Sequence, residues 1–317
     1  MKRILILLLV VYSMQGFARE NTITAAGDPQ WIAGGDEMFF MAPAFSPDRN
    51  NIAVTSARYT GLWVIDIETN AISQITDEDG AGFGYSWSDD SRALLARVSR
   101  YENQRRLTAV KIFDIDRNVE HTVVDYRRGI SGVPQWNSTY NGVLIQTRER
   151  LELFDAPGYR QPDRIDNDRD RMIITNGASI ATASVDARDI REIDPFPGEQ
   201  YLNVAISPDG KKIAFEVLGG NMYAMNSDGS NSIDLGRGYR PQWSPDSEFI
   251  VYMITEDDGH NYTASDIYSI RFDGTDRTRL TDDPNRLYMN PSWSPGGGQI
   301  IFNDITDGAI YLLDIIK

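Results

Sequence analysis

The sequence contains no cysteine, which excludes disulfide bonds, thiol nucleophiles and a lipid-modified cysteine. A chain without disulfides depends on its hydrophobic core, and 317 residues are enough to bury a large one. Positive charge is also scarce, because 31 lysines and arginines oppose 46 aspartates and glutamates, for a formal charge of −15. Such an acidic surface repels phosphate backbones and anionic lipid, so we expect no nucleic-acid partner.

Histidine is nearly absent as well, since the chain has only His121 and His260. Neither lies beside a nucleophile-elbow serine or in a pair spaced for metal binding, so we expect both at the surface. Residues 166–170 carry carboxylates at alternate positions. A calcium loop of the EF-hand kind would need glycine and glutamate where Arg171 and Gly177 stand. We therefore predict no catalytic residue, no metal site and no cofactor.

Long apolar runs are missing after the N-terminus. Lys2 and Arg3 precede the apolar residues 4–12, and the small residues Gly16 and Ala18 follow. This layout is typical of a cleavable secretory signal, and the run is shorter than the roughly 20 apolar residues that span a bilayer. We predict that residues 1–18 are removed after Ala18. Residues 19–317 would then form one exported domain, periplasmic or secreted, without a transmembrane anchor.

What the chain does contain is a repeated phrase. A large apolar residue is followed by Ser-Pro-Asp or a variant of it, and then by a β-branched and aromatic run, as in PQWSPDSEFIVYM. Proline presets one backbone angle and aspartate bonds to its own backbone, so the phrase predicts a tight turn between two strands. The large residues before these turns are Phe45, Trp87, Trp136, Ile206, Trp243 and Trp293, at intervals of 42, 49, 70, 37 and 50 residues.

Most of these intervals match a four-stranded propeller blade of about 40–50 residues. We predict an all-β propeller of four-stranded antiparallel blades, with six blades favoured and seven as the alternative. The interval of 70 residues between Trp136 and Ile206 is interpreted as one blade with an insertion, the alternative being a degenerate seventh blade. The final blade lacks an outer strand, so we expect an N-terminal strand around residues 30–34 to close the ring.

The segments WSPDSEFIVYM and DIYSIRFDGTDRTRLT resemble the repeats of the TolB family, which are exported bacterial propellers. The resemblance covers most of residues 37–317. TolB proteins also carry an α/β domain before the propeller, and the residues between Ala18 and the first repeat are too few for one. The resemblance implies the fold rather than the activity, because propellers host many unrelated functions.

The links between blades are expected to lie on one face of the propeller, beside the central channel, with the Ser-Pro-Asp turns on the opposite face. Aromatic residues and arginines gather in these links, and both are enriched at the centres of interfaces. For the tyrosines, packing between blades is the alternative. The predicted binding residues at this mouth are Phe83, Tyr85, Tyr201, Arg237, Tyr239, Arg240, Arg286 and Tyr288.

These patterns predict a non-enzymatic module of the bacterial cell envelope that binds or scaffolds a protein partner and is itself a monomer. The alternative is a propeller enzyme acting on a carbohydrate, a lyase or a glycosidase, with carboxylates in the channel. Converging acids in the channel would favour the enzyme. A rim of arginine and tyrosine would favour the binding module.

Overall fold

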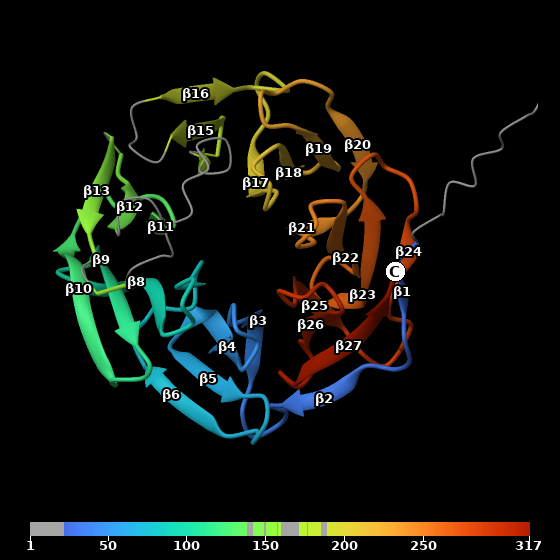
Figure 1. The fold of residues 1–317 in the computed structure, drawn as a ribbon, viewed down its shortest axis with the longest axis horizontal. Coiled ribbons are helices and arrows are strands. Elements are labelled where there is room, and N and C mark those ends of the chain that lie inside the picture. The colour runs from blue at the N-terminus through green and yellow to red at the C-terminus, as the bar shows by residue number, and fades with distance from the viewer. Residues whose placement is uncertain are drawn as a thin grey trace, which may run out of the picture.

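The computed structural model describes residues 22–137, 142–148, 150–156, 158–159, 171–175, 177–184 and 189–317. Within these ranges the strands form seven antiparallel sheets, arranged around a common centre as the blades of a propeller (Figure 1). The predicted signal, residues 1–18, and the acidic residues 166–170 lie outside the described part. No helix in the described ranges is long and apolar enough to cross a membrane.

The blades follow one another in chain order. Blade 1 comprises β3 (Phe40–Phe45), β4 (Asn51–Ser56), β5 (Leu62–Asp66) and β6 (Ile72–Thr76), with the short 3-10 helix η1 (Ala57–Tyr59) between β4 and β5. Blade 2 comprises β7 (Ser86–Trp87), β8 (Ala93–Glu102), β9 (Arg105–Asp114) and β10 (Val119–Arg127). Blade 3 comprises β11 (Gln135–Asn137), β12 (Gly142–Gln146) and β13 (Leu151–Asp155).

Blade 4 comprises β14 (Arg171–Thr175), β15 (Ile180–Ser184) and β16 (Ile190–Ile193). Blade 5 comprises β17 (Tyr201–Ile206), β18 (Lys212–Val217), β19 (Met222–Asn226) and β20 (Ile233–Gly236). Blade 6 comprises β21 (Tyr239–Trp243), β22 (Phe249–Asp257), β23 (Tyr262–Arg271) and β24 (Thr278–Arg279). Blade 7 comprises β25 (Tyr288–Trp293), β26 (Gln299–Asp304) and β27 (Ile310–Ile316), joined by the N-terminal strands β1 (Thr24–Ala25) and β2 (Gln30–Ala33).

The favoured count of six blades is wrong, and the alternative of seven is correct. The long interval between Trp136 and Ile206 holds two sheets, blades 3 and 4, rather than one blade with an insertion. The strands β14 and β15 form a complete antiparallel hairpin, in which Ile173 lies opposite Thr182. Blade 4 escapes detection because no Ser-Pro-Asp phrase precedes its hairpin.

The N-terminus closes the ring, as predicted. Strand β2 pairs antiparallel with β27, with Gln30 opposite Leu312 and Trp31 opposite Tyr311. Strand β1 pairs with the end of the same strand, with Thr24 opposite Ile316. Figure 1 shows these first strands along the outer edge of blade 7, next to blade 1. The first and last segments of the chain therefore share one sheet, which joins the two ends of the ring.

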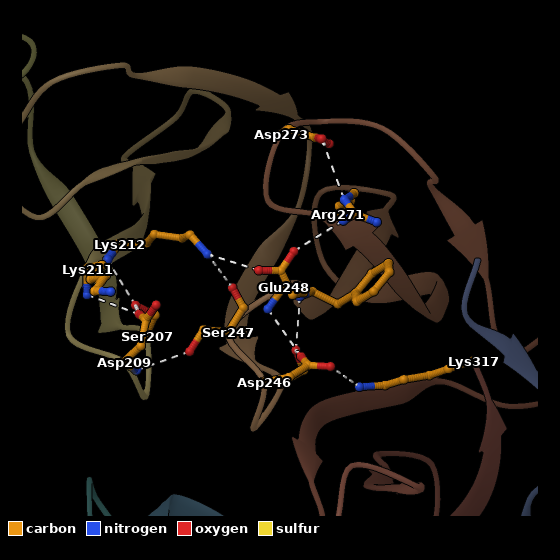
Figure 2. Close-up of polar contacts among 12 residues, drawn as sticks. Ser207, Asp209, Lys211, Lys212, Asp246, Ser247, Glu248, Arg271, Asp273 and Lys317 are labelled. Carbon is orange, nitrogen blue, oxygen red and sulfur yellow. Dashed lines mark hydrogen bonds and ion pairs between the residues drawn. The ribbon is translucent and has the colours of Figure 1, made fainter. Parts of the chain in front are cut away.

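The Ser-Pro-Asp turns are built around a buried serine. In blade 5 the Ser207 hydroxyl donates to Asp209 Oδ1 at 2.6 Å and accepts from the Lys212 amide at 2.9 Å. The amide of Asp209 donates to Ser247 Oγ of blade 6 at 3.1 Å (Figure 2). Burial raises the pKa of Asp209, but the hydrogen bonds from Ser207 and the Lys211 amide outweigh it, and the net pKa lies below its ordinary value. Each turn thus closes its own hairpin and also binds the next blade.

Where a tryptophan precedes the turn, it binds to the neighbouring blade. The indole N–H of Trp243 donates to the Ala205 carbonyl of blade 5 at 3.0 Å, and that of Trp293 donates to the Gln242 carbonyl of blade 6 at 3.2 Å. Trp87 makes the equivalent bond to the Ala44 carbonyl of blade 1 at 3.1 Å. The indole ring is buried in the same place, so each tryptophan combines hydrophobic packing with a satisfied polar group.

We expect Trp243→Ala to lower the free energy of unfolding by about 3–5 kcal/mol, because it removes a buried ring and leaves a cavity between blades 5 and 6. Trp243 is 7% exposed, whereas Trp31 is 59% exposed. Trp31→Ala is the matched control and should cost less than half as much. Urea denaturation followed by circular dichroism measures both, and equal losses would contradict the buried role.

We also expect a mature chain that begins at Asp36 to melt at a lower temperature than one that begins at Thr22. The shorter chain lacks β1 and β2, so β27 would expose its outer edge and the ring would lose its closing pairs. Differential scanning calorimetry of the two proteins, with light scattering for aggregation, tests this. Identical melting curves would show that the closing strands do not stabilise the ring.

Candidate functional site

One face of the propeller carries the links between blades and the loops between the second and third strands of each blade. We call it the link face, and the Ser-Pro-Asp turns lie on the opposite, turn face. In blade 1 the loop after β4 touches the link that follows β6: Thr60 Oγ1 donates to Asp79 Oδ1 at 3.3 Å, and the Gly82 amide donates to the Tyr59 carbonyl at 3.1 Å. Loop and link thus form one continuous surface.

The inner strands are bulged just below the link face. Ala42, Asn203, Arg240 and Asn290 all have φ between 48° and 55°, and each lies at a register shift between the first and second strands of its blade. A bulge turns one residue out of the ladder and re-aims its side chain. In β21 the bulged residue is Arg240, whose guanidinium reaches the Tyr59 hydroxyl of blade 1, and β21 is an inner strand near the centre of the ring (Figure 1).

A side chain of the preceding blade satisfies the amide of the bulge. The Arg240 amide donates to Glu216 Oε1 at 2.5 Å, and Asn203 Nδ2 donates to the same oxygen at 2.7 Å. In blade 7 Asn303 Oδ1 likewise accepts from the Ala42 amide at 3.1 Å. Burial raises the pKa of Glu216 despite these hydrogen bonds. The Glu216 carboxylate is therefore engaged in holding two blades together.

Four residues of the link face form what we call the mouth cluster: Tyr59, Phe83, Arg97 and Arg240. The rings of Tyr59 and Phe83 meet edge to face, with centroids 5.4 Å apart. The Arg97 guanidinium lies over the Phe83 ring, 4.4 Å from its centroid. From the other side, Arg240 Nη2 donates to the Tyr59 hydroxyl at 3.0 Å. The cluster joins blade 6 to blades 1 and 2.

Backbone constraints hold the aromatic pair in place. Phe83 lies between Gly82 and Gly84, and a Cβ atom at residue 82 would lie 1.9 Å from Thr55 Oγ1. The link therefore lies directly against β4. Tyr59 has a φ of 59° and follows Arg58 at 62°, a conformation that is costly for residues other than glycine. Phe83 keeps 41% of its surface exposed.

Arg97 is half-buried and lacks a carboxylate partner among the described residues. Its Nη1 donates to the carbonyls of Ser131 at 3.3 Å and Gly132 at 3.2 Å. Its Nε is buried and has no hydrogen-bond acceptor in the described part of the chain. Burial, with the nearby charge of Arg106, lowers the pKa of Arg97. The protonated guanidinium is thus less well compensated here than it would be in water.

Of the eight predicted binding residues, the structure brings Phe83 and Arg240 together in this cluster. The three tyrosines at 85, 201 and 288 pack within or between blades instead. The Tyr85 hydroxyl lies 2.6 Å from the Ala42 carbonyl of blade 1, and burial raises its pKa. The Tyr201 hydroxyl donates to Asp194 Oδ1 at 2.7 Å, and burial together with this bond raises its pKa to about 12. Tyr288 is 4% exposed.

The remaining three predicted residues are placed apart from the cluster. Arg286 Nη1 forms ion pairs with Asp304 at 2.9 Å and Asp307 at 2.7 Å, and these carboxylates raise the pKa of Arg286 further. Arg237 is exposed and donates to the Thr255 carbonyl. Tyr239 is half-buried and packs against the core between blades 6 and 7.

The sequence analysis did not identify Tyr59 or Arg97 as site residues, although a repeated position in the sequence points to Arg97. Nine positions after the serine of each turn, the chain places Thr55, Arg97, Glu216, Met253 and Asn303. Glu216 and Asn303 hold the amide of a bulge from this position, and an arginine there is a signal of a different role. Tyr59 carries no comparable signal, because it lies in an irregular loop.

Acids and histidines do not converge at this site. The described residues contain no group of three or more histidine, cysteine, aspartate or glutamate side chains able to hold a metal ion. His121 is exposed on β10, with its ring 5.8 Å from that of Tyr159, and His260 is exposed in the hairpin between β22 and β23. The mouth cluster itself offers two guanidiniums and two aromatic rings, which are groups that bind rather than groups that transfer protons at neutral pH.

The described strands form a seven-bladed β-propeller, and its link face carries one cluster of two arginines and two aromatic residues. Solved structures share this fold. TolB from Acinetobacter baumannii matches with a TM-score of 0.53 and 18% identity, over 80% of this chain but only 57% of that protein. A putative TolB from Agrobacterium tumefaciens matches with a TM-score of 0.53 and 15% identity, over 88% of this chain and 91% of that one.

A third match is the β-propeller domain of Cps50 (Swd1) from Myceliophteria thermophila, with a TM-score of 0.61 and 12% identity, over 92% of this chain and 99% of that domain. Neither a protein-family model nor a curated protein sequence matches the chain. At these identities the likenesses show the fold alone, and the TolB likeness confirms the resemblance seen in the repeats.

We expect Gly82→Ala to lower the free energy of unfolding by about 1–3 kcal/mol, because the new methyl group would overlap Thr55 and push the link off β4. Gly298→Ala is the matched control, since a Cβ atom there meets no atom within 4 Å. Chemical denaturation of both variants measures the difference. Equal stability would show that the link is not pressed against blade 1.

Proposed function

We propose that this chain is an exported, non-enzymatic propeller that binds or scaffolds a protein partner in the bacterial cell envelope, and that its link face is the recognition surface. The proposal rests chiefly on one observation. The mouth cluster exposes an aromatic pair between two arginines whose guanidinium groups form no ion pair within 4.0 Å among the described residues. Aromatic residues and arginine are the types that dominate the energetics of protein interfaces.

Apolar surface on the same face supports the proposal. The described side chains there include large ones that remain between 36% and 41% exposed. They are Met38, Phe39, Phe83, Val133 and Leu202. Exposed apolar groups rimmed by polar residues mark protein interaction sites more often than isolated surface residues do. The acidic remainder of the surface, at a formal charge of −15, disfavours nucleic acid as the partner.

The turn face provides a contrast around blades 5 and 6. There Lys212 Nζ lies 3.5 Å from Glu248, and Arg271 lies 3.2 Å from Glu248 and 3.6 Å from Asp273 (Figure 2). Lys317 pairs with Asp246. These cations are neutralised within the molecule and leave little charge for a partner. The guanidinium groups of the mouth cluster form no such ion pair in the described residues, so they are available to a partner.

The carboxylate nearest the cluster also favours binding over catalysis. Glu216 accepts two hydrogen bonds that hold the bulge of β21, so it is committed to structure. Export is supported by the apolar segment within residues 1–18 and by the resemblance of the repeats to an exported family. These two observations bear on the location of the protein, whereas the link face bears on what the protein binds.

The test is affinity capture of the tagged mature protein from its native envelope fraction, followed by mass spectrometry. We expect Arg240→Gln to lose a partner that the native protein retains. The matched control is Lys211→Gln, which removes an exposed cation on the turn face and should leave capture unchanged. If all three proteins capture only background, the binding module is wrong, and turnover of oligosaccharides becomes the next assay.

A further inference from the structure

We infer that the mouth cluster binds an extended acidic peptide segment of the partner, with carboxylates on either side of an apolar residue. The inference rests on the proposed function and specifies the chemistry of what is bound. Arg97 and Arg240 would each take a carboxylate. The apolar residue between these carboxylates would lie against the exposed part of Phe83.

The arrangement of the two guanidiniums carries this inference. Arg97 stacks on Phe83 at 4.4 Å, and Arg240 bonds to the hydroxyl of Tyr59 at 3.0 Å, so the two cations flank one aromatic pair. They approach it from different blades and from positions 143 residues apart in the chain. A ligand that pairs with both is therefore expected to carry two negative charges, with an uncharged part against the aromatic pair between them.

The donors left over on each arginine fit carboxylates. A guanidinium presents five N–H groups in a planar fork that matches a carboxylate with two parallel hydrogen bonds. Arg97 donates within the described protein only through Nη1, and because Nε is buried, Nη2 is the donor that remains for a ligand. The side chain of Arg240 uses only Nη2, on the Tyr59 hydroxyl. A carboxylate can therefore bind either arginine without displacing an ion pair.

Electrostatics favour the bound state. A half-buried cation without a counter-ion is costly, and a carboxylate brought to it recovers that cost in a site of low dielectric constant. The pKa of Arg97 is lowered by burial and by Arg106, which places a second positive charge nearby. Arg286 shows the opposite case, because two aspartates already satisfy it. Arg97, in contrast, forms no ion pair in the described part of the chain, and its guanidinium bonds only to backbone carbonyls.

The neighbouring surface favours a peptide over other anions. Val133 and Leu202 are 36% and 41% exposed on the same face, and they suit aliphatic side chains better than sugar hydroxyls or phosphates. The acidic protein would also repel a polymer that carries a negative charge on every unit. A short peptide segment with two acidic residues limits that repulsion to its own charges.

The first experiment selects from a random 12-residue peptide library displayed on phage against the immobilised mature protein. We expect enrichment of peptides in which aspartate or glutamate flanks an aromatic or aliphatic residue. Affinity of a selected peptide, labelled with fluorescein, is then measured by anisotropy. Arg97→Gln or Arg240→Gln should weaken binding about tenfold, as a lost hydrogen bond between charged groups does. Lys211→Gln on the turn face should leave the affinity unchanged.

Two further measurements guard against a merely structural effect. Arg97→Lys keeps the charge but loses the fork, so it should fold normally and still bind more weakly than the native protein. Replacing the acidic residues of the peptide with their amides should abolish both the affinity and its dependence on salt between 50 and 500 mM. Melting temperatures of all variants identify any that fail to fold.

The inference is overturned if the selected peptides show no acidic bias, or if their affinity survives both glutamine substitutions in folded protein. Absence of any enriched peptide also overturns it, and an array of uronic-acid and neutral oligosaccharides then tests whether the arginines bind an anionic sugar instead. The proposed function is tested separately by the capture experiment, and it is rejected if the native protein captures only background. A partner that is captured equally by the native protein and by Arg97→Gln would uphold a binding module while rejecting the mouth cluster as its acidic-peptide site.

Discussion

The hydrogen bond from the tryptophan indole to the inner strand of the preceding blade is the contact on which the ring depends. Trp87, Trp136, Trp243 and Trp293 all make it, with distances between 3.0 and 3.3 Å. An isolated blade cannot bury both of its faces, so stability comes from stacking each blade on its neighbour. The bond sets the relative position of two blades while the indole ring fills the space between them. Hydrogen bonds between neighbouring turns, such as that from Asp209 to Ser247, add a second contact between the blades.

The link face follows from the same construction. The inner strands of blades 1, 5, 6 and 7 bulge just after the link. In blades 5 and 7 the side chain nine positions after the turn serine, Glu216 or Asn303, supports the bulge of the next blade. Arg97 occupies that repeated position in blade 2 and supports a different structure, the link of residues 131 and 132. Arg240 occupies a bulge and reaches Tyr59. The mouth cluster thus draws Arg97 and Arg240 from positions that in other blades support the scaffold.

Much of the fold could be predicted because the repeat is local. The turn phrase, the strand on each side of it and the closing strand at residues 30–34 all follow from short patterns, and the structure confirms them. The blade count failed because blade 4 lacks the Ser-Pro-Asp phrase, although its hairpin of β14 and β15 pairs fully and packs against the core of blade 5. Two residues of the mouth cluster, Phe83 and Arg240, were predicted from the composition of the links. The predicted tyrosines at 85, 201 and 288 instead pack within or between blades.

The sequence by itself determined that this chain is a β-propeller with acidic blades and with arginine and aromatic residues in its links, because turn chemistry and strand periodicity depend on neighbours in the chain. Only the tertiary structure decided which of those residues have partners. Arg286 meets Asp304 and Asp307 within one blade, whereas Arg240 meets Tyr59 from 181 residues away. Whether a charge is neutralised depends on what the closed ring brings beside it, and that information is not local.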